Sequence, residues 1–142
     1  MSEASDPLYR KALLRLAADA AGAGHLPAPH AAATAANPAC GDRVTMEVTL
    51  QDGRIAALAH DTKACILTQA SAAILGAAAP GLDPAALAAL EDGVRAMLKD
   101  GAPPPLPAYE AFDGAAAISA RHVCVLLPFQ ALREALESAE PG

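Results

Sequence analysis

A short alternating stretch near the middle of the sequence restricts the fold more than any other feature. Residues 44–50 place a hydrophobic side chain at every second position, with Thr or Glu between them. Asp52-Gly53 follows, and Ile55, Ala57 and Ala59 then occupy alternate positions of the return segment. This period is typical of a half-buried strand, and Asp-Gly favours a type I′ turn because Gly accepts a positive φ without a steric clash. We therefore predict an antiparallel hairpin over about residues 43–60.

Helical periodicity and capping residues mark the other regular elements. Asp83-Pro84 has the form of an N-cap followed by proline at the first helical position, and Asp6-Pro7 has the same form at the start of the first predicted helix. Residues 22–39 are rich in Gly, Pro and Ala, and they are expected to form a loop, with a short edge strand near Ala32–Thr34 as the one candidate element. The predicted helices cover about residues 7–20, 66–79, 84–98 and 109–118, and a last one begins near Pro128.

The order of these elements indicates the fold class. The strands are grouped rather than alternating with helices, which is typical of α+β proteins. We expect helices packed on one face of a small antiparallel sheet, with a long C-terminal helix. A chain of 142 residues is long enough to bury one continuous core, so we expect a single domain over residues 1–142.

Charge and hydropathy exclude two classes of partner. The net charge is −6, so there is no general positive field to attract nucleic acid. Residues 64–82 carry no formal charge, but Pro80-Gly81 interrupts them and they are too short for a hydrocarbon layer of about 30 Å. The first six residues are acidic where a signal peptide would be basic. We expect a cytoplasmic protein that binds neither nucleic acid nor a membrane.

Three cysteines, Cys40, Cys65 and Cys124, lie far apart in the sequence. An odd number does not suit a disulfide framework, and the cytosol would keep them as thiols. They are either buried separately or converge as ligands. The hairpin brings the segment that holds Cys40 next to the segment that holds Cys65. Cys65 and Cys124 each lie just before or at the start of a predicted helix, where free N–H groups and the helix dipole stabilise a thiolate, which favours convergence.

The residues around these cysteines resemble a known family. "NPACGD", residues 37–42, resembles the N-P-x-C-G-D signature of the IscU/NifU/SufU iron–sulfur cluster assembly scaffolds. "CILTQASA", which begins at Cys65, is similar to the second motif of that family, and "RHVCVLL", around Cys124, is similar to the third. Leu8-Tyr9-Arg10 is similar to the opening of the family. The resemblance extends over essentially the whole chain.

Two details distinguish the branches of this family. The long separation between Cys65 and Cys124, with Arg121 three residues before the latter, resembles the SufU branch more than the shorter IscU branch. In IscU-type members a histidine directly precedes the third cysteine, whereas Val123 does so here and His122 lies one residue further away. Ala64 also replaces the glycine that usually precedes the second cysteine.

The resemblance implies a metal site with mixed ligands. Cys40, Cys65, Cys124 and Asp42 would ligate Zn²⁺ or a transient iron–sulfur cluster, of the 2Fe–2S or 4Fe–4S type. Thiolates suit both kinds of cargo, and a carboxylate is a harder and more labile ligand, which suits a site that releases what it holds. The alternative for Asp42 is a turn residue that accepts hydrogen bonds from nearby backbone N–H groups.

Two further residues are candidates for auxiliary roles. His122 could share a metal with Cys124 if the segment is extended, because residues i and i+2 of a strand lie on one face; otherwise it contacts a partner or lies on the surface. Arg121 either pairs with Asp42 or a cysteine thiolate or persulfide, or is an exposed surface charge. His25, His30 and His60 have no ligand spacing and are expected at the surface or in loops.

By resemblance, the chain is expected to be a scaffold or sulfur acceptor rather than a classical enzyme. A SufS-like cysteine desulfurase would pass persulfide sulfur to Cys124 or Cys65, with Cys124 favoured because a loop before a helix can be mobile. A downstream cluster scaffold or apo iron–sulfur proteins would receive the product, and the chain would be a monomer or weak dimer. The alternative is a zinc-stabilised adaptor or activator of a desulfurase that transfers neither sulfur nor cluster.

Overall fold

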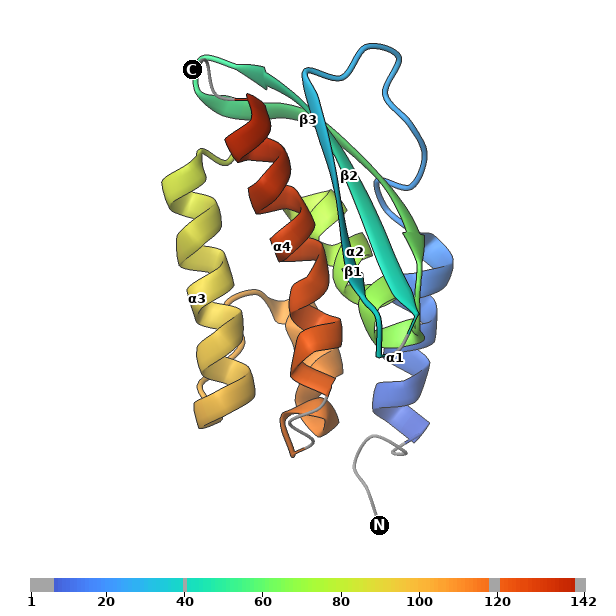
Figure 1. Cartoon of the computed structure of the whole chain (residues 1–142). Helices are drawn as coiled ribbons and strands as arrows, with labels where there is room; N and C mark the ends of the chain where they lie inside the picture. The colour runs from blue at the N-terminus through green and yellow to red at the C-terminus, as the bar shows by residue number, and fades with distance from the viewer. Residues whose placement is uncertain (1–6, 40, 118–120, 140–142) are drawn as a thin grey trace.

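The computed structural model describes residues 7–39, 41–117 and 121–139. Four α-helices, one 3₁₀-helix and a three-stranded antiparallel sheet make up this part of the chain, so the predicted α+β class is confirmed (Figure 1). In chain order the elements are α1 (Pro7–Asp19), β1 (Ala31–Asn37), β2 (Asp42–Gln51), β3 (Arg54–Lys63), α2 (Ile66–Ala78), α3 (Pro84–Asp100), η2 (Pro107–Ala117) and α4 (His122–Ala139).

The predicted hairpin forms the centre of the sheet. Its strands β2 and β3 are joined by Asp52 and Gly53, whose φ angles of 55° and 76° are both positive, as a type I′ turn requires. In the register of the pair, Met46 lies opposite His60 and Arg43 lies opposite Lys63. The start of β2 and the end of β3 therefore lie next to each other, at the end of the hairpin where α2 begins.

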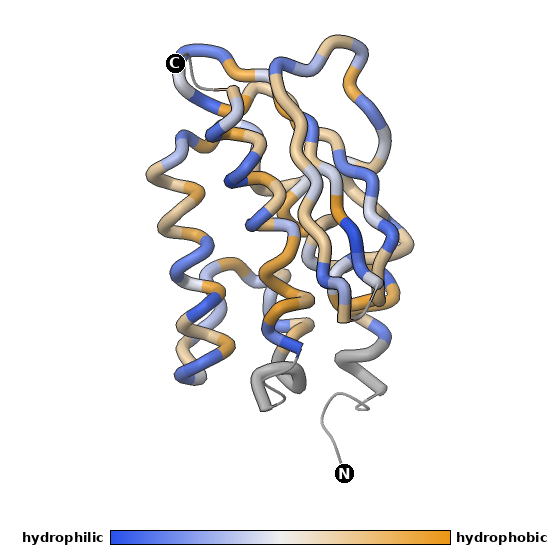
Figure 2. The backbone as a smooth tube through the Cα atoms, viewed as in Figure 1, coloured by the Kyte–Doolittle hydropathy of each residue, from blue (hydrophilic) through white to orange (hydrophobic). Residues whose placement is uncertain are grey.

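The helices cover the face of the sheet that carries the alternating hydrophobic side chains. Val44, Met46 and Val48 are fully buried, and the residues between them are partly exposed. Helix α4 packs against β1 and β2, and α2 packs against β3 and α4 (Figure 1). The first half of α4 is mostly hydrophobic, as Figure 2 shows, because this half carries the residues that meet the sheet and α2.

The edge strand β1 is longer than the sequence indicated. It pairs with β2 from Ala31 opposite Val48 to Asn37 opposite Asp42, where only a short strand near Ala32–Thr34 was expected. Alanine has a low intrinsic preference for strands. Pairing along the whole of β2 and cover from α4 stabilise this alanine-rich strand, so tertiary contacts override its local preference.

The start of α4 corrects one prediction. The helix begins at His122 rather than near Pro128, so Cys124 lies in its first turn and not in a loop ahead of it. Pro128 is buried inside the helix and has no N–H to donate to the carbonyl four residues earlier. Burial of Phe129 and Leu132 on the same helix compensates for the lost hydrogen bond.

The remaining elements close the core around α2 and α4. α1 packs against α2 and η2, and α3 packs against α4. Asp83 caps α3 as predicted, because its side chain accepts a hydrogen bond of 2.8 Å from the backbone N–H of Ala86. The helix predicted over 109–118 is the 3₁₀-helix η2, which buries Tyr109 and Phe112, and Ile118 lies outside the described residues. In the described part of the chain, no helix is both long and apolar enough to span a membrane.

Candidate metal centre

Asp42 points toward the helices because of its place in β2. It is the first residue of that strand and shares a face with Val44 and Met46, since alternate residues of a strand point the same way. Its side chain is therefore buried, with only 4% of the residue exposed. A buried carboxylate needs hydrogen-bond donors, and they come from the first turn of α2.

Cys65 is the N-cap residue of α2 and provides two of these donors. Its backbone N–H donates to Asp42 Oδ1 at 3.1 Å, and its Sγ lies 3.5 Å from Asp42 Oδ2. A helix leaves its first N–H groups without internal acceptors, and Asp42 supplies one from a different element. Asp42 thus caps α2, and its negative charge lies at the positive end of the helix dipole.

Thr68 completes the contacts of the Asp42 carboxylate. Its hydroxyl donates to Asp42 Oδ2 at 3.3 Å and lies 3.5 Å from Cys65 Sγ. Thr68 is three residues after Cys65, which places both side chains on one face of the helix start, and it is fully buried. The carboxylate therefore contacts one N–H, one thiol and one hydroxyl, all from α2 or its cap.

Cys124 reaches the same place from the first turn of α4. It is 3% exposed, and a hydrogen bond of 2.6 Å from Ser71 Oγ to the carbonyl of Val125 ties this turn to α2. The carboxylate oxygen of Asp42 and the sulfur atoms of Cys65 and Cys124 all lie within 4.8 Å of one another. This group is the candidate metal centre.

Two helix N-termini meet at the candidate metal centre. The N-termini of α2 and α4 both lie at the group, so two positive helix ends face the sulfur atoms. Two thiolates and one carboxylate carry three negative charges when all are ionised, and a bound cation would neutralise most of that charge. The arrangement can therefore bind a thiophilic metal.

Three of the four predicted ligand residues, Asp42, Cys65 and Cys124, come together in the structure. The fourth, Cys40, lies outside the described residues. Asp42 does accept a hydrogen bond from a backbone N–H, but this group belongs to Cys65 on another element and not to the turn that Asp42 follows in the sequence. Arg121 is exposed. The ion pairs of the described residues do not include one between Arg121 and Asp42, so the predicted pairing of Arg121 with Asp42 or a cysteine stays a prediction.

His122 is half-buried in the first turn of α4 and is not one of the three residues that form the group of close ligand atoms in the described chain. His122 and Cys124 were expected to share a metal only if the chain around them were extended, but it is helical. Residues i and i+2 of a helix point about 200° apart, so His122 and Cys124 do not share a face.

Sequence reasoning missed two buried polar residues, Thr68 and His60. Thr68 was not singled out, although its position three residues after a cysteine at a helix start was a usable signal. His60 was expected at the surface but is only 4% exposed, because it faces inward from β3. His25 and His30 lie in exposed positions as expected.

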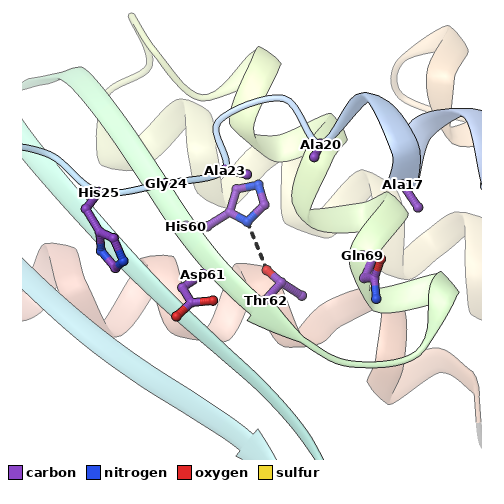
Figure 3. Close-up of a pocket in the computed structure, with 9 residues that line it drawn as sticks. All are labelled: Ala17, Ala20, Ala23, Gly24, His25, His60, Asp61, Thr62 and Gln69. Carbon is purple, nitrogen blue, oxygen red and sulfur yellow. Dashed lines mark hydrogen bonds between the residues drawn. The ribbon is translucent and has the colours of Figure 1, made fainter.

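His60 lines a cavity of about 230 Å³ beside β3 (Figure 3). Its Nε2 donates to the carbonyl of Ala21 at 2.9 Å, so Nδ1 of the neutral ring accepts from the hydroxyl of Thr62 at 2.9 Å. Burial lowers the pKa of His60 below its usual value, and the Ala21 carbonyl opposes this in part. Gln69 of α2 also lines the cavity, and its amide donates to the carbonyl of Ala64.

Comparisons with known proteins give the class of this chain. The model of the NifU-like N-terminal domain matches residues 8–124, so the chain belongs to that family. This confirms the family indicated by the cysteine motifs. A search of curated proteins gave no significant match.

Solved structures agree with this assignment. The N-terminal part of a nitrogen-fixing NifU-like protein from Brucella abortus is 31% identical, with 96% of each chain covered and a TM-score of 0.87. A protein from Fervidobacterium islandicum AW-1, described as an iron–sulfur cluster assembly scaffold protein for the SUF system, is 20% identical. That match covers 93% of this chain and 98% of the other, with a TM-score of 0.81, and shows likeness of fold alone.

Proposed function

We propose that this chain is an iron–sulfur cluster scaffold and sulfur acceptor whose cargo is held by Cys40, Asp42, Cys65 and Cys124. The observation that carries the proposal is the convergence of the ligand atoms of Asp42, Cys65 and Cys124 within 4.8 Å. Membership in the NifU-like N-terminal family supports it. Cys40 is included because it lies two residues before Asp42 in the "NPACGD" motif.

The chemistry of the donor set suits a cargo that is held and then released. Three thiolates and one carboxylate complete a tetrahedral site for Zn²⁺, and the same thiolates bind the iron of a nascent cluster. A structural zinc site normally uses only cysteine and histidine. One oxygen ligand from Asp42 makes the set weaker than four thiolates, which favours transfer over permanent retention.

Cys65 is the better acceptor of persulfide sulfur among the two described thiols. It is half-buried, whereas Cys124 is 3% exposed inside α4, so the earlier preference for Cys124 loses its premise of a mobile loop. In the transfer step, the Cys65 thiolate attacks the terminal sulfur of the desulfurase persulfide. A new S–S bond forms on Cys65, the old S–S bond breaks, and the desulfurase cysteine leaves as a thiolate.

We propose the cytoplasm as the location in which this chain acts.

The second candidate function is that of an adaptor. A tightly held zinc at the same residues would order the site, and the chain would bind or activate a desulfurase without accepting sulfur. The burial of Asp42 and Cys124 is compatible with such a permanent site. The two functions differ in whether a thiol is free to react.

One experiment separates these functions. Purified protein is incubated with a SufS-like desulfurase and cysteine, and intact and peptide mass spectrometry locate any added sulfur. We expect one additional sulfur atom on Cys65, and none there in the Cys65→Ser variant. Subsequent anaerobic addition of iron(II) and a reductant should produce the visible absorption of a cluster.

The controls use the same samples. Metal analysis before the reaction reports zinc content, and Cys124→Ser tests the second thiol. A protein that retains one zinc and gains no sulfur on any cysteine would reject the transfer function in favour of the adaptor. Persulfide without cluster formation would identify a sulfur relay instead of a scaffold.

A further inference from the structure

Thr68 occupies a position that the ligand set does not explain. Its hydroxyl contacts two of the proposed ligands at once, Asp42 Oδ2 at 3.3 Å and Cys65 Sγ at 3.5 Å. The residue is fully buried in the first turn of α2. A buried hydroxyl is costly unless it makes a hydrogen bond, so the contact with Asp42 is part of what stabilises Thr68 at this position.

We infer that Thr68 is a positioning residue of the metal centre, whose hydroxyl fixes the orientation of the Asp42 carboxylate toward the cargo. This inference rests on the proposed function. Thr68 does not ligate the metal itself. It acts through Asp42, in the way that a hydrogen bond to a metal-ligating carboxylate orients that ligand.

The donors to Asp42 differ in whether they are themselves proposed ligands. The Cys65 sulfur that contacts Asp42 Oδ2 is one of the proposed ligands, so in the loaded centre it would be directed toward the cargo. The Cys65 backbone N–H remains, but it is fixed on Oδ1. Among the described residues, Thr68 is the donor to Oδ2 that is not itself a proposed ligand, and its hydroxyl is available to hold the carboxylate in place.

This geometry lets Thr68 hold the Asp42 carboxylate in one orientation. Its hydroxyl donates to a carboxylate oxygen, and such charge-assisted bonds are stronger than neutral ones. Without the hydroxyl, the carboxylate can turn away from its working orientation and one negative ligand loses a donor. Loss of such a supporting contact typically weakens metal binding by about 10–100-fold.

The test compares Thr68→Val, which keeps the shape and removes the hydroxyl, with Thr68→Ser, which keeps the hydroxyl. Co²⁺ alone is titrated into each metal-free protein under anaerobic conditions, and Zn²⁺ competition gives the relative affinity. We expect Thr68→Val to bind about 10-fold more weakly or worse and to shift the Co²⁺ ligand-field bands. Thr68→Ser should restore both the affinity and the spectrum.

Two controls separate positioning from general damage to the fold. Thr45→Val removes a hydroxyl bonded to Thr34 at 2.7 Å on the other face of the sheet, and it should leave the Co²⁺ spectrum unchanged. In an Asp42→Asn background, Thr68→Val should have little further effect, because Thr68 acts through the carboxylate. Circular dichroism and the Tm of each variant report whether it is folded.

The outcomes are distinct. Equal affinity and an identical Co²⁺ spectrum in wild type and Thr68→Val would overturn the role of Thr68 and leave the proposed function intact. The role would also be rejected by an equal loss in the Asp42→Asn background, or by a failure of Thr68→Ser to restore binding. A wild-type protein that binds neither Co²⁺ nor Zn²⁺ would overturn the proposed function and this inference together.

Discussion

Asp42 joins two tasks in one side chain. It caps α2 through the backbone N–H of Cys65, and it contributes an oxygen to the candidate metal centre. The first task needs no metal. The effect of Asp42 on stability can therefore be measured in the metal-free protein, separately from its contribution to metal binding.

We expect Asp42→Ala to lower the free energy of unfolding of the metal-free protein by about 1–3 kcal/mol, because it leaves the Cys65 N–H and the Thr68 hydroxyl without their acceptor. Urea denaturation in the presence of a chelator measures this. Asp83→Ala is the matched control, since Asp83 caps α3 near the surface and its loss should cost about 1 kcal/mol. Unchanged stability in Asp42→Ala would reject the capping role.

The buried His60 predicts how stability depends on pH. Burial lowers its pKa, so the ring is neutral in the native protein where the unfolded chain takes up a proton. The unfolded state then binds more protons, and stability falls as the pH drops through the ordinary value of 6.5, until the native ring also titrates. Between about pH 7 and pH 5, wild type should lose more stability than His60→Gln.

His25 provides the control for this pH profile. The carboxylate of Glu47, 2.8 Å away, raises the pKa of His25, so its contribution is present at low pH and is lost as the pH rises. Removal of His25 should change the profile in the opposite sense, and weakly, because the His25 side chain is exposed to solvent. Identical profiles for wild type and His60→Gln would show that His60 is not buried as a neutral ring.

At the scale of elements, Gly76 sets how closely α2 approaches the turn after α1. A Cβ at this position would lie 2.2 Å from the carbonyl oxygen of Ala21, which also accepts the hydrogen bond of His60 Nε2. We expect Gly76→Ala to lower the unfolding free energy by about 1–3 kcal/mol, although alanine favours helices by about 1 kcal/mol. Thermal and urea denaturation measure the change.

Ala77→Gly is the neighbouring control, because Ala77 is exposed on the same helix and reports helix propensity without a steric contact. It should cost about 1 kcal/mol. If Gly76→Ala were instead as stable as wild type, the close approach of α2 to Ala21 would be wrong.

The elements that the sequence predicted well are those with strong local signals. The Asp52-Gly53 turn and the Asp83 cap act within a few residues, so local reasoning finds them. The start of α4 was missed because an interior proline costs about 3 kcal/mol locally. Burial of Phe129 and Leu132, at about 1.5–3 kcal/mol each, offsets that cost but depends on the sheet, which no local pattern contains.

At the scale of the whole molecule, three elements distant in sequence assemble the candidate centre. β2 supplies Asp42, the cap of α2 supplies Cys65, and α4 supplies Cys124. Cysteine motifs indicated these residues, and the hairpin indicated that two of the three chain segments meet. The hydrogen bonds that orient them, from Thr68 to Asp42 and from Ser71 to Val125, depend on side-chain packing and could not be read from the sequence.

A metal that joins these elements stabilises the native fold, since ligands from separate elements do not form the site in the unfolded chain. The central claim is therefore the mixed ligand set of Cys40, Asp42, Cys65 and Cys124. X-ray absorption at the zinc edge of protein loaded with one equivalent of Zn²⁺ tests it most directly. The account predicts three sulfur ligands at about 2.3 Å and one oxygen at about 2.0–2.2 Å, with the oxygen contribution changed in Asp42→Ala. Two or fewer sulfur ligands, or a spectrum that Asp42→Ala leaves unaltered, would contradict it.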